Sequence, residues 1–191
     1  MKTSTKVWIG VGIFALLLIF GVIGAYNNFI TMNQDINGKW SEVESQYQRQ
    51  ADLIPNLISV VSSAVTVETN FVKEVVEARA KWQSAATNLA KDTAGTAMNN
   101  GITALVSAVA ENYPTLQANK QYTALTDELS GTQNRITTAR GRYIESVQKF
   151  NTGIKRFPSN MLAGMFGFSE VEYYTAEDGT TTPELGTGVL P

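Results

Sequence analysis

The chain has 191 residues, of which 43% are hydrophobic and only five are proline, a composition typical of one helix-rich domain. It contains neither cysteine nor histidine, which excludes thiolate nucleophiles, Ser-His-Asp triads and histidine-ligated zinc or di-iron sites. Beyond residue 25 it holds 13 basic and 17 acidic residues, so it lacks the broad positive surface that nucleic-acid binding needs.

Residues 7–25 form one uninterrupted apolar segment. Its 19 residues carry no charge and would span about 28 Å as a helix, close to the thickness of a bilayer's hydrocarbon core. Lys2 and Lys6 flank only its N-terminal side, and Trp8 and Tyr26 lie near its two ends. We therefore expect a single-pass anchor in the cytoplasmic membrane, with the N-terminus inside and the rest of the chain on the periplasmic or extracellular side.

A cleaved secretory signal peptide is the alternative for this segment. Its apolar core is usually about 7–15 residues long and ends at a small-x-small cleavage site, which Ile23-Gly24-Ala25 matches poorly. An anchor is therefore favoured. Gly21 and Ala25 form a small-xxx-small pair, which would allow two copies to pair as a homo-oligomer within the membrane.

The three-four spacing of apolar residues after the anchor predicts an amphipathic helix. No proline occurs before Pro55, so this helix can continue directly from the anchor. Pro55 disfavours helical geometry at Ile54, and we expect a kink or a break there. The residues that form the apolar stripe are Phe29, Ile36, Trp40, Val43, Tyr47 and Ile54.

A second helix is expected over 57–89, on the same kind of spacing. The segment 91–101 contains small and polar residues and two glycines, which predicts a connection between helices. A shorter helix over 102–112 follows and should stop at Tyr113-Pro114.

The longest apolar stripe predicts a helix over 120–156, capped by Asn119. Such a stripe needs a partner surface of comparable length, which the first two helices can supply. The expected fold class is therefore all-α, with the transmembrane helix followed by an antiparallel bundle of three to four long helices. The stripe consists of Tyr122, Leu125, Leu129, Thr132, Ile136, Ala139, Tyr143, Val147, Phe150 and Ile154.

These elements divide the chain into four parts. They are a short cytoplasmic N-terminus (1–6), the transmembrane anchor (7–25), an extracytoplasmic helical bundle (26–168) and an irregular acidic tail (169–191). Tyr173 and Tyr174 are expected to pin the start of the tail to the bundle.

Motifs spread over nearly the whole chain resemble those of the LemA family, and it is their combination that is specific. They are Tyr26-Asn27, the run Arg49-Gln50-Ala51-Asp52-Leu53-Ile54-Pro55-Asn56-Leu57, Ala78-Arg79, Glu111-Asn112-Tyr113-Pro114, Asn134-Arg135-Ile136, Ala139-Arg140, Tyr143, Asn151 and Phe157-Pro158. The chain departs from the family pattern at Gln133, where glutamate is usual, and at Ile144, where asparagine is usual. The resemblance implies a membrane-anchored bundle of long helices without established enzymatic activity, often found beside membrane metallopeptidases or other envelope proteins.

Arg49, Asp52 and Asn56 follow one another at steps of three and four, so they share one helical face beside the apolar stripe. One interpretation is a site for a ligand or a partner. The other, which we favour, is a polar clasp in which Arg49 and Asp52 pair with Glu111, Asn134 or Arg135 and fix the register of the helices. The candidate structural or partner-binding residues are Arg49, Asp52, Asn56, Glu111, Asn134, Arg135 and Arg140.

The last long helix is the most basic part of the domain. Two interpretations remain open for its charged face: an ordinary solvated surface, or docking against an acidic partner or anionic lipid. The basic residues are Arg135, Arg140, Arg142, Lys149, Lys155 and Arg156.

No spacing typical of catalytic carboxylate pairs, Ser-Lys chemistry, phosphate-binding loops or calcium loops occurs in the sequence. We therefore expect no enzymatic activity, no cofactor and no metal site. The leading hypothesis is a membrane-anchored structural or interaction protein that recruits or organises envelope partners. The alternative is a small-ligand or lipid-binding module with a pocket between helices near Arg49, Asp52 and Glu111.

Overall fold

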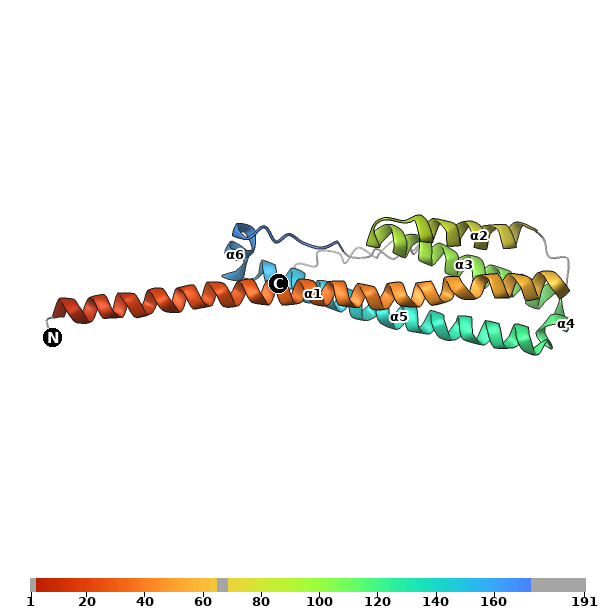
Figure 1. The fold of residues 1–191 in the computed structure, drawn as a ribbon, viewed down its shortest axis with the longest axis horizontal. Helices are drawn as coiled ribbons and strands as arrows, with labels where there is room; N and C mark the ends of the chain where they lie inside the picture. The colour runs from red at the N-terminus through yellow and green to blue at the C-terminus, as the bar shows by residue number, and fades with distance from the viewer. Residues whose placement is uncertain (1–2, 65–68, 173–191) are drawn as a thin grey trace, which may run out of the picture.

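The computed structural model describes residues 3–64 and 69–172, and all regular structure in these ranges is helical, which confirms the all-α prediction (Figure 1). Four helices are long: α1 (Thr3–Ala64), α2 (Thr69–Ser84), α3 (Asn88–Asn112) and α5 (Lys120–Lys155). Two are short: α4 (Pro114–Gln117) and α6 (Ser159–Met165).

Helices α1 and α5 form a long antiparallel pair, and α2 and α3 form a hairpin that packs on the half of this pair farthest from the N-terminus (Figure 1). The antiparallel order is visible in the contacts of α1: Trp40 packs edge-on against Tyr143, whereas Arg49, farther along α1, pairs with Glu128. The expected apolar stripe of α5 is buried in this pair, except for Leu125, which is half-buried. Helix α1 thus supplies the partner surface of comparable length that the apolar stripe of α5 needs.

The apolar segment and the first bundle helix are one continuous helix. Helix α1 runs for 62 residues, and its first part projects alone from the bundle (Figure 1). Among the side chains described, the first buried one is Phe29, and the large hydrophobic residues from Trp8 to Ile23 are exposed except for Val22, which is half-buried. By length and composition, this is one helix long and apolar enough to cross a membrane.

Helix α1 also continues through Pro55, so of the kink or break expected at this residue, the break does not occur. Proline has no N–H, and it therefore leaves the carbonyl of Ala51, four residues earlier, without its helical partner. The guanidinium of Arg79 on α2 donates a hydrogen bond of 2.9 Å to this carbonyl. A side chain from the neighbouring helix thus replaces the missing backbone donor.

The predicted connection over 91–101 is wrong, because α3 runs through it and the turn comes earlier, at residues 85–87. The expected helix over 57–89 is accordingly divided: its first turns complete α1, and α2 ends at Ser84. The two glycines of this segment do not break the helix but allow its neighbours to pack closely against it. A Cβ on Gly95 would lie 2.5 Å from the ring of Tyr47, and one on Gly101 would lie 3.3 Å from Val75.

The remaining boundaries follow the expected chemistry. Thr87 caps α3 by accepting a hydrogen bond from the N–H of Ala90, and α3 ends at Asn112, before Pro114. The Asn119 side chain accepts from two backbone N–H groups of the first turn of α5, as predicted. The expected contacts of Tyr173 and Tyr174 lie outside the described residues.

Replacing Arg79 by methionine removes the donor to Ala51 while keeping an unbranched stem. We expect R79M to lower the free energy of unfolding by about 1–3 kcal/mol, because a buried carbonyl loses its partner. In a P55A background a backbone N–H takes this carbonyl, so the same R79M change should cost less. The four proteins are the wild type, R79M, P55A and the double variant. Their unfolding by denaturant in detergent micelles, followed by circular dichroism, measures the coupling between Arg79 and Pro55. An equal loss in both backgrounds would contradict the link between the two residues.

Candidate functional site

Three helices contribute to a buried polar cluster of Tyr47 on α1, Asp92 on α3 and Arg140 on α5. The Tyr47 hydroxyl donates a hydrogen bond of 3.2 Å to one carboxylate oxygen of Asp92, and Arg140 donates one of 2.8 Å to the other oxygen. Only 6% of the Asp92 side chain and 25% of the Arg140 side chain are exposed. Loss of one partner would leave the other charge buried and unpaired, so this contact fixes how α3 and α5 lie against each other, and the Tyr47 hydrogen bond adds α1.

Burial dominates the electrostatics of this cluster. It raises the pKa of Tyr47 to about 12, and the negative charge of Asp92 acts in the same direction. Burial also raises the pKa of Asp92, against the opposing effects of Arg140 and of the hydrogen bond from Tyr47. The arrangement holds a proton on Tyr47 far into the alkaline range, which suits a structural donor and not a base.

Two further polar pairs join α1 to α3 on either side of this cluster. The Lys91 ammonium pairs with Glu44 and also lies 5.8 Å from the centre of the Trp82 ring. The Gln50 amide donates a hydrogen bond of 3.0 Å to the side-chain oxygen of Asn99. From one pair to the next, the residue numbers increase along both helices, so α1 and α3 run parallel. Polar contacts at successive turns set their register.

Of the predicted residues, Arg49 forms its ion pair with Glu128 on α5, at 2.7 Å, and Arg135 approaches the same carboxylate at 3.8 Å. Asp52 accepts a hydrogen bond of 2.8 Å from Gln48 within α1. The clasp between α1 and α5 therefore exists at Arg49, but its partner is Glu128, and neither Arg49 nor Asp52 pairs with the expected Glu111, Asn134 or Arg135. Arg49 is 54% exposed and Glu128 is 34% exposed, so solvent weakens this pair.

The other predicted residues lie apart from one another. Glu111 is exposed near the end of α3, and Asn56 is exposed on α1, where it lines a shallow groove with Glu128. Asn134 and Arg135 lie on the exposed side of α5, whereas Arg140 belongs to the buried cluster. The structure thus divides the candidate set between a solvated face and an interior contact.

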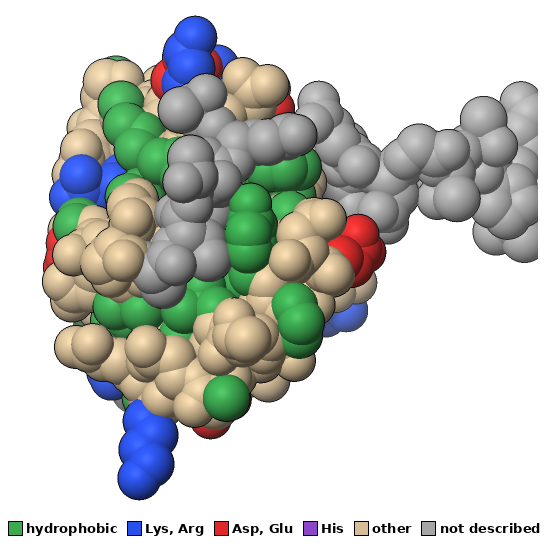
Figure 2. Space-filling model, turned by 90° about the vertical axis from the view of Figure 1, so that its right-hand side faces the viewer, with side chains coloured by type: hydrophobic (Ala, Val, Ile, Leu, Met, Phe, Trp, Pro, Cys, Tyr) green, Lys and Arg blue, Asp and Glu red, His purple; other side chains and the backbone are tan. Residues whose placement is uncertain are grey.

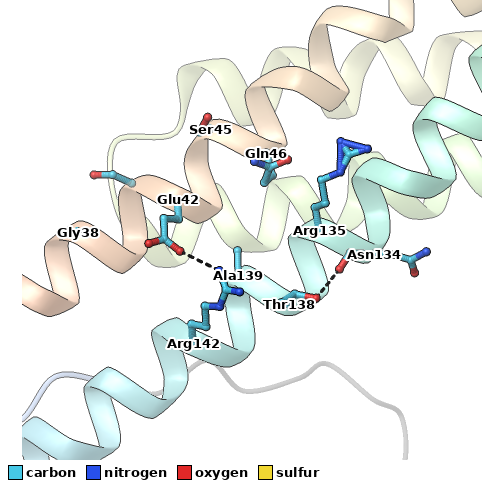
Figure 3. A pocket seen from close by; sticks show the side chains of 10 residues that line it. Gly38, Glu42, Ser45, Gln46, Asn134, Arg135, Thr138, Ala139 and Arg142 are labelled. Atoms are coloured by element: carbon cyan, nitrogen blue, oxygen red, sulfur yellow. Dashed lines mark hydrogen bonds and ion pairs between the residues drawn. The ribbon is translucent and has the colours of Figure 1, made fainter.

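An open groove of about 730 Å³ lies between α1 and α5 (Figure 3). Glu42 and Arg142 face each other across it at 3.5 Å, and a hydrogen bond from Lys39 holds the pKa of Glu42 below its ordinary value. In the described part of the chain, the buried amide oxygen of Gln46 has no hydrogen-bond partner. The groove is lined by Gly38, Ser41, Glu42, Ser45, Gln46, Asn134, Arg135, Thr138, Ala139 and Arg142.

A smaller cavity of about 270 Å³ lies where α1, α3 and α5 meet. Gln50 lines it, and the side-chain oxygen of this residue is buried without a hydrogen-bond partner among the described residues. Arg49, Asp52 and Glu111 do not line this cavity or either of the two grooves. The described residues include no cluster of three or more acidic side chains that could hold a metal ion.

The family model that describes the LemA family matches residues 39–185. The chain belongs to the LemA family. Two relatives named magnetosome protein MamQ 1 and MamQ 2, from Paramagnetospirillum magneticum strain AMB-1, are each 27% identical over 87% of this chain and 72% of their own length. A third, magnetosome protein MamQ from Magnetospirillum gryphiswaldense strain MSR-1, is 29% identical over 83% of this chain and 67% of its own length.

Several residues of the LemA-like motifs prove to hold helices together. Arg79 donates to the Ala51 carbonyl, and Arg140 pairs with Asp92. The Asn151 side chain both accepts from the N–H of Val171 and donates to its carbonyl, at 3.0 and 2.8 Å. Each of these contacts joins the first or last long helix to a different segment of the chain.

Sequence reasoning missed Asp92, Tyr47 as a polar group, Lys91 and Glu128. Asp92 could have been found, because it continues the spacing of the buried residues Gly95, Met98 and Ile102. A carboxylate on an apolar stripe signals a buried partner of opposite charge. The expected loop over 91–101 concealed this pattern.

The raised pKa of Tyr47 predicts a loss of stability at alkaline pH. The unfolded chain releases this proton near the ordinary value of 10.0 and the folded chain near 12. Stability from this group is complete below about pH 10 and is lost as the pH rises through 12. Between about pH 9 and pH 12 we expect the wild type to lose roughly 2 kcal/mol more than the Y47F variant. Denaturant unfolding at stepped pH tests this, and parallel curves for the two proteins would contradict it.

Proposed function

We propose that this LemA-family protein is anchored in the cytoplasmic membrane by the apolar part of α1 and presents its bundle outside the cytoplasm to recruit or organise envelope proteins, without catalysis of its own. The observation that carries this proposal is the continuity of α1. An apolar segment that enters the bundle without a linker holds the bundle at a fixed angle to the membrane. The lysines at positions 2 and 6, before the apolar segment, favour an N-terminus inside.

The groove between α1 and α5 is the surface that we propose for a partner. It combines an open shape with Arg135 and Arg142, both exposed, and with a buried Gln46 oxygen that can accept a hydrogen bond. Guanidinium groups pair with carboxylates in a bidentate geometry, so an acidic segment of an envelope protein fits this surface. A membrane metallopeptidase is one such partner that the LemA resemblance implies.

The end of the bundle farthest from the N-terminus is more hydrophobic than the charged groove (Figure 2). Where Figure 2 draws described residues, it shows hydrophobic side chains gathered on this end and charged side chains near its rim. Its partly buried hydrophobic residues include Val60, Phe71, Val72 and Tyr113. Since these side chains already pack on the core, we assign the partner contact to the charged groove and not to this end.

Photocrosslinking in intact membranes tests the proposal. A benzoylphenylalanine placed at Thr138, in the groove, should give a discrete adduct with an envelope protein that mass spectrometry identifies, and charge reversal by R142E should weaken it. The same probe at Lys73, exposed on α2 and outside the groove, is the matched control. Recovery of the uncrosslinked chain alone from both positions would overturn the proposal.

A small-ligand module is the second candidate, and the cavity beside Gln50 favours it. A buried amide oxygen without a partner can accept a hydrogen bond from a small polar ligand. This cavity replaces the pocket expected near Arg49, Asp52 and Glu111.

A ligand in this cavity should raise the melting temperature and change the tryptophan fluorescence of the protein. Small-metabolite mixtures and a polar lipid extract are the probes, and Q50M is the matched variant, because it fills the same space without the acceptor. An equal response of Q50M and the wild type would place binding elsewhere. No response of the wild type would remove the support for this function.

A further inference from the structure

Helix α6 presents apolar side chains to solvent on one face. Met161 and Met165 are 69% and 66% exposed, and Phe157, just before the helix, is 81% exposed. They follow one another at steps of four, so the two methionines share one side of α6. Ala163, on the opposite side, is buried against the bundle. One apolar side of α6 thus packs on the bundle through Ala163, and the side with the methionines is unpartnered in the described residues.

The position of α6 indicates what covers this face. Phe166, which directly follows α6, packs edge-on against Tyr26 of α1 with ring centres 5.0 Å apart, and Phe168 packs against Phe29 at 5.2 Å. Tyr26 is the first residue after the apolar segment 7–25. Figure 1 shows α6 beside α1 at the level where α1 leaves the bundle. In a protein anchored by that segment, this level is the lipid–water boundary.

We propose that α6 is a second membrane contact, which inserts Phe157, Met161 and Met165 into the headgroup region of the bilayer that α1 crosses. The inference rests on the proposed membrane anchoring. A helix that lies in this region buries its exposed apolar face about 5–10 Å deep, toward the acyl chains. Contact with lipid removes from water the side chains that the bundle leaves exposed.

The charges around α6 are compatible with this position. Arg156, immediately before Phe157, is exposed and can reach headgroup phosphates. Lys155 forms an ion pair of 2.8 Å with Glu170, which offsets that acidic charge. The exposed Ile23 and Ile30 of α1 extend the apolar surface above and below Tyr26.

The absence of cysteine makes the test direct, because a single introduced cysteine is the only labelling site. A nitroxide spin label is attached to M161C or M165C in the full-length chain, reconstituted as one copy per lipid nanodisc. Collision of the label with oxygen, which concentrates in lipid, is compared with collision with a water-soluble nickel complex. L17C, within the apolar segment, reports the anchor, and T137C, exposed on α5, reports water.

We expect the oxygen-to-nickel collision ratio at M161C and M165C to be several-fold higher than at T137C but below the value at L17C, because the headgroup region is shallower than the middle of the anchor. Labels on α6 that behave like T137C, while L17C lies in lipid, overturn the contact of α6 but leave the anchor intact. A label at L17C that lies in water overturns the anchoring itself. Protection of the α6 labels from both reagents indicates cover by protein and also overturns the lipid contact.

Discussion

Helix α1 is one continuous helix that contains both the apolar segment and the bundle helix that pairs with α5, and the other elements are arranged around it. This continuity has a weak point at Pro55, where the helix lacks a donor for the Ala51 carbonyl. Arg79 supplies that donor from α2. One guanidinium thus preserves the helix and also fastens the α2–α3 hairpin to it. From the end of the apolar segment to Ala64, the helix extends roughly 60 Å.

Packing of apolar stripes brings the helices together, but it does not by itself choose between neighbouring registers. Buried polar groups make that choice, because a shift by one turn leaves them without partners. Tyr47, Asp92 and Arg140 tie three helices at one level, and Gln50 with Asn99 ties two of them about one turn farther along. Gly95 admits the Tyr47 ring at the same level, so the close approach and the polar contact depend on each other.

The parts of the fold that could be predicted from the sequence depend on long-range periodicity and on local backbone chemistry. The stripe of α5 and its Asn119 cap are of this kind. The α3 region was misread because glycine has two roles: Gly95 and Gly101 reduce intrinsic helix propensity, yet they also permit close helix packing, and only the tertiary structure decides. The ion-pair partners of the charged side chains could not be predicted from the sequence either. The spacing of Arg49 predicts a clasp to a neighbouring helix, but it does not single out Glu128, which forms the pair.

A helical rod attached to a membrane at one point can turn about its own axis, so the face that it presents is not defined. Helix α6 lies to the side of α1, at the level where the apolar segment ends (Figure 1). With α6 seated among the headgroups as we propose, two contacts separated sideways would fix this rotation. Arg135 and Arg142 belong to α5, which packs along α1 and is joined to α6 by residues 156–158. The direction in which the groove faces along the membrane would then follow from the helix packing of the bundle itself, without a contribution from the partner.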